Sequence, residues 1–315
     1  MIPDLLIIAI CFFFIFKSAD ILVSSSSRIA AHYGIPPVFI GLVLVGLGTS
    51  APEIFVTAIA SYTKHPGVVI GNATGSIACN AGLAMAVIFW LLKPGEAPAD
   101  MKALGSRFCL VNGLFLAGGA AVMMFFLQNG VSPLKGLALL AVVILYLFVN
   151  SRISKKFAEV PAPEGKIWVV LVKLFCGLAA LVIASKFLVV SATSFAEKIG
   201  IPEIIIGITL IAVGTSIPEI ATSISATRQG KIGIAVGELV GSQALNLYLL
   251  LGLASLIRPF AVENSKHIFG WMAFILGELM LLIWLKKIPS KLKALIALFT
   301  YAVYIAFNFR FLMPA

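Results

Sequence analysis

The chain has 315 residues, of which 61% are hydrophobic and 11% are charged, and its mean hydropathy is +1.09. This balance excludes a soluble globular domain, in which about a quarter of the residues are charged. The net charge of +10 does not indicate nucleic-acid binding, because Lys and Arg lie between apolar segments and form no basic stripe interleaved with aromatic residues. The composition predicts a polytopic membrane protein.

About ten apolar segments approach the ~20 residues that a helix needs to cross a bilayer. The first includes Lys17 and Asp20 and has no small-residue cleavage site, so we expect a retained helix and not a signal peptide. The fold class predicted is therefore all-α integral membrane, with ten transmembrane helices. In chain order, they are expected near residues 4–31, 36–60, 67–92, 107–127, 133–150, 167–196, 202–226, 233–257, 268–285 and 292–312.

The basic residues indicate an orientation. When the loops are assigned alternately to two sides, 15 of the 23 Lys and Arg residues fall on one side and 6 on the other, and 2 lie inside helices. The positive-inside rule makes the richer side cytoplasmic and places both termini outside.

The chain contains an internal duplication. The stretch GIPPVFIGLVLVGLGTSAPEI from Gly34 returns as GIPEIIIGITLIAVGTSIPEI from Gly200, and residues 34–80 and 200–246 are identical at 19 of 47 ungapped positions. Five helices per copy is an odd number, so the second copy must enter the membrane from the opposite side. We expect two inverted five-helix repeats, residues 1–150 and 167–315, joined by a cytoplasmic linker at 151–166. In transporters such repeats place the binding site near the midplane at their interface.

Each copy carries the motif G-T-S-x-P-E within an apolar segment. A proline inside a helix removes a backbone donor and frees carbonyls near Gly48 and Gly214, and such a break is tolerated only beside protein or a water-filled cavity. Hydroxyls and a carboxylate lie next to each break, so the motifs gather oxygen ligands suited to a hard cation. Those side chains are Thr49, Ser50, Glu53, Thr215, Ser216 and Glu219.

A second polar row follows in each copy, at spacing i, i+4, i+8 along one helix face. It consists of Asn72, Ser76 and Asn80 in the first copy and Glu238, Ser242 and Asn246 in the second. Together the copies offer the 6 to 8 oxygens that calcium takes, whereas magnesium sheds its water reluctantly and fits less well. Sodium also accepts oxygen-only cages. The alternative is that the serines and asparagines only form hydrogen bonds between packed helices. Glu278, on the ninth segment, has no repeat partner near a proline break, which favours a structural role.

The paired motifs, each followed 23 residues after its glutamate by a serine and 27 after by an asparagine, resemble the two alpha repeats of the calcium/cation antiporter superfamily. The sodium/calcium exchanger branch, prokaryotic type, is the nearest likeness. The resemblance implies that Glu53 and Glu219 bind the ions with the hydroxyls named above and those of Ser76 and Ser242. It also implies ligation by backbone carbonyls of Gly46 and Ala212 and by the Asn80 amide, and a sliding gate formed by the first and sixth helices.

Three positions depart from the family pattern: Asn246 replaces a frequent aspartate, Ile77 and Gln243 replace asparagines, and Glu238 replaces another. Two core carboxylates balance one calcium, which leaves proton or potassium coupling open. Glu238, ~12 Å along the helix from Asn246 at 1.5 Å per residue, either attracts cations at a cytoplasmic mouth or stabilises a helix start. Within the expected gate, Asp20 pairs either with its repeat equivalent Lys186 or locally with Lys17.

The function expected is antiport of Ca²⁺ for a monovalent cation by alternating access, with sodium first and proton or potassium coupling as the alternative. We expect no cofactor, since no P-loop is present, and no enzyme activity, since no H-E-x-x-H or protease arrangement occurs. The expected partners are inorganic cations and the lipid bilayer, and not nucleic acid. The expected location is a prokaryotic cell (inner) membrane. A channel is the rival within transport.

Overall fold

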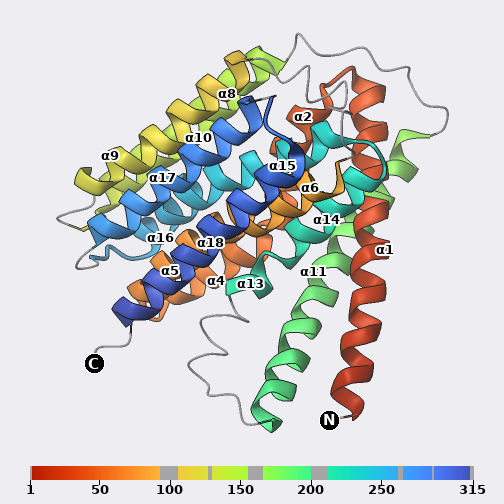
Figure 1. Cartoon of the computed structure of the whole chain (residues 1–315), viewed down its shortest axis with the longest axis horizontal. Helices are drawn as coiled ribbons and strands as arrows, with labels where there is room; N and C mark the ends of the chain where they lie inside the picture. The colour runs from red at the N-terminus through yellow and green to blue at the C-terminus, as the bar shows by residue number, and fades with distance from the viewer. Residues whose placement is uncertain are drawn as a thin grey trace.

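The computed structural model describes residues 2–92, 106–126, 130–154, 166–199, 212–261, 265–285 and 287–312. The described chain is helical throughout, apart from one isolated bridge between Val131 and Phe260. Eight of its helices are long and apolar enough to cross a membrane, or nine if one bent pair counts as a single span. The protein is thus an all-α, multi-pass membrane protein (Figure 1).

The first half contains six stretches of helix, several of them divided by π-helical turns. The elements are α1 (Ile2–Tyr33), α2 (Pro37–Ile40), η1 (Gly41–Val45), α3 (Gly46–Thr49), α4 (Ala51–Tyr62), α5 (Pro66–Cys79), η2 (Asn80–Ala84), α6 (Met85–Leu91), α8 (Ser106–Gly113), η3 (Leu114–Gly118), α9 (Gly119–Phe126) and α10 (Pro133–Ser154).

The second half repeats much of this order. Its elements are α11 (Ile167–Lys198), α13 (Ala212–Thr215), α14 (Ile217–Arg228), α15 (Ile232–Ala244), η6 (Leu245–Leu250), α16 (Leu251–Ile257), α17 (Ser265–Trp284) and α18 (Ser290–Leu312).

These bounds agree with nine of the ten predicted segments to within a few residues, while the first half of the seventh, residues 202–211, lies outside the described residues. The count of ten therefore stays a prediction, as does the division into two domains. Helix α10 continues to Ser154, into the predicted linker at 151–166, and residues 155–165 of that linker are not described.

The helix breaks have the same geometry in both copies of the repeat. Ser50 separates α3 from α4 with φ −79° and ψ 7°, and Ser216 separates α13 from α14 with φ −88° and ψ 3°. The two helices on either side of Ser50 are bent by 47°. Each proline stands in the first turn of the helix after the break, where its missing N–H is not needed. The prolines therefore start a new helix rather than kink a continuous one.

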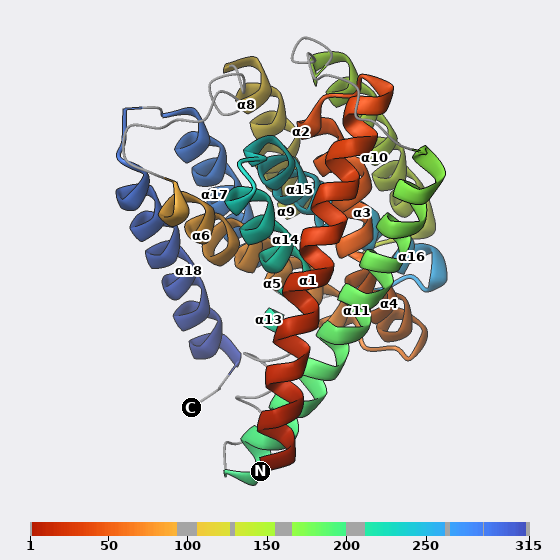
Figure 2. The same cartoon turned by 90° about the vertical axis from the view of Figure 1, so that its right-hand side faces the viewer.

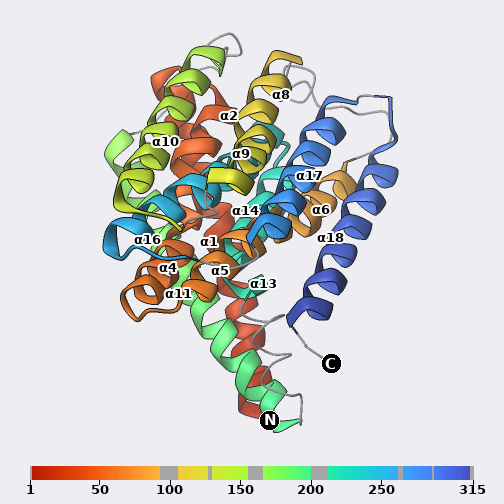
Figure 3. The same cartoon turned by 90° about the vertical axis from the view of Figure 1, so that its left-hand side faces the viewer.

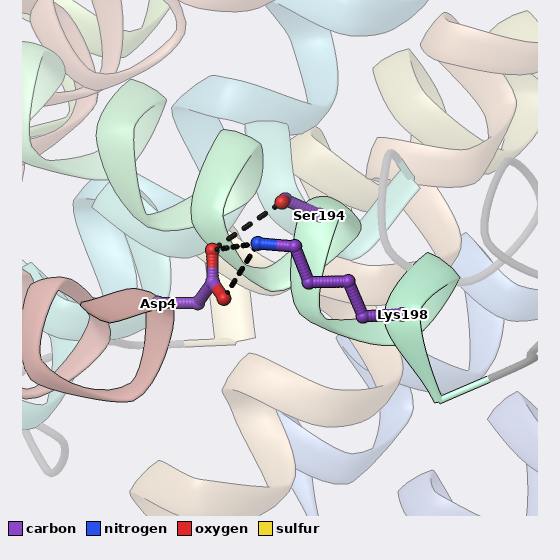
Figure 4. Close-up of polar contacts among 3 residues, drawn as sticks. All are labelled: Asp4, Ser194 and Lys198. Atoms are coloured by element: carbon purple, nitrogen blue, oxygen red, sulfur yellow. Dashed lines mark hydrogen bonds and ion pairs between the residues drawn. The ribbon is translucent and has the colours of Figure 1, made fainter. Parts of the chain in front are cut away.

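Helices α1 and α11, each of 32 residues, occupy equivalent places in the two repeats and pack along each other in opposite directions. They lie side by side and extend beyond the rest of the bundle in Figures 2 and 3. At one end, Lys198 donates to both carboxylate oxygens of Asp4 at 2.9 and 2.8 Å, and Ser194 donates at 3.3 Å (Figure 4). An inverted repeat requires this opposite direction.

The centre of the bundle is packed through glycines. A Cβ on Gly237 would lie 2.0 Å from the backbone oxygen of Val38, and one on Gly241 would lie 2.3 Å from that of Leu42. Helix α15 therefore contacts α2 and η1 backbone to backbone, as small residues spaced four apart allow in membranes. This close approach brings the two repeats together at the polar residues described next.

Candidate cation-binding site

The hydroxyl of Thr49 stays within its own helix break. It donates to the carbonyl of Val45 at 3.1 Å and approaches that of Gly46 at 3.4 Å. The backbone N–H of Ser50 also donates to Gly46 at 3.0 Å. The carbonyl predicted as a ligand is thus at the break, but it already accepts protein hydrogen bonds. The carbonyls that the proline was predicted to free near Gly48 are partly satisfied by this local rearrangement.

Glu219 lies in a cluster that draws on both repeats. Ser50 of the first repeat donates to Glu219 Oε1 at 3.0 Å, and Ser242 of the second repeat donates to the same oxygen at 3.5 Å. The two serine hydroxyls are 2.9 Å apart, and the Asn80 amide donates to Ser242 at 3.1 Å. All of these side chains are buried. Residues from η2, α14, α15 and the first break therefore meet at one point.

Glu53 has a matching arrangement. Ser76, 23 residues later, donates to Glu53 Oε1 at 3.4 Å, as the equivalent Ser242 does to Glu219. The Ser76 hydroxyl also lies 3.5 Å from that of Thr215, in the other repeat's break. Asn72 is held apart from this cluster, since its amide donates to the backbone oxygen of Glu53 and to Thr57. Each glutamate is thus bound by its own repeat's serine, and hydroxyls from the opposite break lie beside both clusters.

Several oxygens of these residues have no hydrogen-bond partner within the described protein, although they are buried. A buried acceptor without a partner is costly, so these oxygens require a partner that the described chain does not supply. Carboxylate, amide and hydroxyl oxygens are the ligands of hard cations. The unpartnered atoms of the predicted ligands are Glu53 Oε2, Glu219 Oε2, Asn80 Oδ1, Asn246 Oδ1 and Ser216 Oγ.

Glu238 is fully buried, and its predicted role at a cytoplasmic mouth stays a prediction. One carboxylate oxygen accepts a hydrogen bond from Thr222, and the other accepts one from Ser223 at 3.4 Å. In the first repeat the equivalent positions hold Asn72 and Thr57, which are also hydrogen-bonded to each other. Glu238 therefore keeps an existing pairing between neighbouring helices. Both of its carboxylate oxygens accept hydrogen bonds, whereas Glu53 and Glu219 each have one unpartnered oxygen.

Asn246 and Ala212 are the remaining predicted ligands, and the structure describes the surroundings of each only in part. Asn246 donates to Ser242 at 3.5 Å, which places its amide beside the Glu219 cluster. Ala212 is the first residue of α13, and the preceding residues 200–211 lie outside the described part of the chain. Its carbonyl as a ligand stays a prediction.

The π-helical turns were not predicted. Asn80 begins η2 and Asn246 lies in η6, so each amide sits where the helix widens by a residue per turn. Such turns are frequent at functional sites. Hydrophobic periodicity does not reveal these turns. A buried segment is apolar on every side, so its pattern looks the same when one turn holds an extra residue.

Asp20 pairs with neither of its two predicted partners in the described structure. Its carboxylate accepts a hydrogen bond of 2.6 Å from Ser225 on α14, and Gln229 donates to that serine at 2.9 Å. The predicted pairs with Lys186 and with Lys17 are wrong for this conformation. The polar contact instead links α1 to the helix that begins beside Glu219.

Helix α11 lies against both breaks. A Cβ on Gly48 would meet the Leu178 side chain at 2.9 Å, and one on Gly214 would meet Val189 at 2.5 Å. Because glycine occupies both positions, the long helix passes close to both ends of the site.

The sequence profile described as "Sodium/calcium exchanger protein" matches residues 4–152 and 169–313 of this chain. Sodium/calcium exchanger MaX1 of Methanosarcina acetivorans is 32% identical, in an alignment that spans 90% of this chain and 91% of MaX1. The putative antiporter CaxA of Alkalimonas amylolytica is also 32% identical, over 86% of this chain and 87% of CaxA.

A similar fold occurs in solved structures of the sodium-calcium exchanger NCX_Mj. In the crystal soaked with 2.5 mM Na⁺ and 0.1 mM Ca²⁺, the likeness covers 97% of this chain and 98% of that one, with a TM-score of 0.80 and 28% identity.

Proposed function

The chain belongs to the sodium/calcium exchanger family, and from that premise we propose that it exchanges Ca²⁺ for Na⁺ across the membrane at the site shared by Glu53 and Glu219. The observation that carries the proposal is the set of buried, unpartnered oxygens around these two glutamates. Two carboxylates match the charge of one Ca²⁺ or of two Na⁺. Both ions therefore compete for the same oxygens, and neither binds while the other is present.

Competition also explains obligatory exchange. A cage that has lost its cations keeps two buried negative charges, which are expensive inside a membrane. The empty protein therefore crosses poorly between its two orientations. Each ion that leaves must be replaced before the site faces the other side.

Alternating access is assigned to α1 and α11. They pack on each other over their length, and α11 touches both helix breaks through Leu178 and Val189. A shift of this pair along the bundle exposes the cage first at one break and then at the other. The site then lies near the midplane, where the two inverted repeats meet. Both termini lie outside the cell in this arrangement.

Proton or potassium coupling is the second candidate, and Asn246 favours it. The neutral amide at this position leaves the cage with two carboxylates, so three sodium ions would carry more charge than the cage balances.

Ca²⁺ uptake into proteoliposomes, measured under separately imposed sodium, potassium and proton gradients, tests the proposal. Uptake driven by an outward sodium gradient, with matching sodium efflux, is expected. Uptake driven only by a proton or potassium gradient would show that this ion, and not sodium, is the coupling ion. Flux without any trans counter-ion would show a channel and refute exchange.

A further inference from the structure

A basic pocket lies at one end of the helix bundle, away from the cation cage. It has a volume of about 230 Å³, and its walls come from the turn between α4 and α5 and from the segment after α16. Lys64, His65 and Arg258 line it. No carboxylate among the described residues forms an ion pair with any of the three. The pocket therefore has room for a small group such as a phosphate, and its charge suits an anion.

Hydrogen bonds hold the pocket walls together. The Ser61 hydroxyl donates to the backbone oxygen of Ala254 at 2.6 Å, which joins the end of α4 to α16. The N–H of Val131 donates to the oxygen of Phe260 at 2.6 Å and anchors the opposite wall. The pocket is thus preformed, and it connects the first repeat to the second.

Lys64 occupies an unfavourable backbone conformation. Its φ is 65°, and within the described part of the chain it is the only residue other than glycine with a positive φ. The equivalent turn of the second repeat has Gly230 there, with φ 70°. Glycine adopts this conformation freely, whereas lysine adopts it only with backbone strain. The first repeat therefore tolerates strain in order to place a cation beside the pocket.

The pocket lies at the depth of lipid headgroups. The candidate spans end or begin at Tyr62, Pro66 and Ile257, so the three basic side chains follow one or two residues beyond. Basic residues at such positions attract anionic lipid. Phe55, Ile59 and Tyr62 form an apolar stripe on α4, the helix that ends at this turn, and each is more than 60% exposed. The spacing of these residues places them on one helix face, which runs along α4 toward the turn that carries Lys64.

We propose that this pocket binds the phosphate headgroup of an anionic phospholipid, with an acyl chain along Phe55, Ile59 and Tyr62. A dissolved anion needs only the cations, whereas a phospholipid also uses the adjoining stripe. The bound lipid links α4, which begins beside Glu53, to α16, which continues the helix of Ser242. It therefore ties the two repeats together at one membrane surface.

The test measures lipid binding to the full chain, so it does not depend on the ion that the protein transports. Delipidated protein in detergent is titrated with phosphatidylglycerol or phosphatidylcholine, and occupancy is read by native mass spectrometry. Lys64→Gln and Arg258→Gln are each expected to weaken phosphatidylglycerol binding by about 5-fold, and the double variant by about 25-fold. Lys166→Gln/Lys173→Gln removes the same charge from exposed positions on α11 and in front of it, and should bind as the wild type does.

A Lys64→Gly variant separates binding from folding. It relieves the backbone and removes the charge, so we expect an equal or higher unfolding temperature together with weaker lipid binding. The proposal is overturned if the double variant binds phosphatidylglycerol as the wild type does, or if the control loses as much. It is equally overturned if phosphatidylcholine binds as tightly, or if inorganic phosphate at the lipid's concentration displaces it, since the pocket is then a plain anion site.

Discussion

Gln243 and Ile77 occupy the same position in the two copies of the repeat, and they touch: Gln243 Nε2 donates to the backbone oxygen of Ile77 at 3.3 Å. A residue meets its own equivalent only close to the axis that relates the copies. This contact therefore locates the centre of the internal symmetry between α5 and α15. The cage residues Ser50 and Ser242 lie on the same two-repeat interface.

Replacing Gln243 tests how much this contact contributes. Gln243→Met keeps the approximate volume and loses the hydrogen bond, so the free energy of unfolding should fall by about 0.5–1.5 kcal/mol. Gln243→Ala also leaves a cavity and should cost about 2–5 kcal/mol. Thermal unfolding in detergent measures both. A methionine variant as unstable as the alanine variant would show that the hydrogen bond, and not the packing, dominates.

The repeats, the two glutamates and their serines could be predicted from the sequence, because both copies of the motif have the same residue types at the same spacings. The hydrogen-bond partners within the site could not be predicted, since Ser50 donates to Glu219 of the other repeat and not to the nearby Glu53. The partner of Asp20 was missed for the same reason: Ser225 is brought close only by packing of α1 on α14. The burial of Glu238 depends on Thr222, a position that holds Val56 in the first repeat.

Glu238 is expected to position the site rather than to bind the cation. Because Thr222 and Ser223 occupy its oxygens, Glu238→Gln should change the Ca²⁺ affinity by less than about 5-fold, while the unfolding temperature falls. Glu219→Gln, made in parallel, should reduce affinity by about 100-fold or more, as expected when a buried charged ligand is lost. Calcium titration of purified protein measures both, and equal losses in the two variants would make Glu238 a ligand.

The contact between Asp20 and Ser225 should influence the conformational change. A hydrogen bond to a charged group contributes about 1.5–3 kcal/mol, so its loss shifts the balance between orientations by roughly 10-fold or more if it forms in only one of them. We expect Asp20→Asn and Ser225→Ala each to alter the rate of Ca²⁺ exchange, and the double variant to differ little from either single one.

The discarded pairing supplies the control for that experiment. Asp20→Lys combined with Lys186→Asp should exchange Ca²⁺ no faster than Asp20→Lys alone. Rescue by the double reversal would reinstate the pair between α1 and α11.

The glycines of α15 should be indispensable for packing. Gly237→Ala places a methyl group against the backbone of Val38, which cannot rotate away, so we expect a loss of at least about 1–3 kcal/mol of stability. Gly118→Ala is the matched control, since a Cβ there meets no described atom within 4 Å and alanine favours helix. Unfolding temperatures should fall for the first variant and stay or rise for the second.

The central claim is that Glu53 and Glu219 share one cation. Density maps of the protein with Ca²⁺, and of Glu53→Gln/Glu219→Gln under the same conditions, test it most directly, with Glu278→Gln as a control that keeps the cage. We expect a Ca²⁺ peak about 2.3–2.6 Å from oxygens of both glutamates, present in the wild type and the control and absent from the double variant. A peak that contacts only one glutamate, or that persists when both are neutralised, would contradict it.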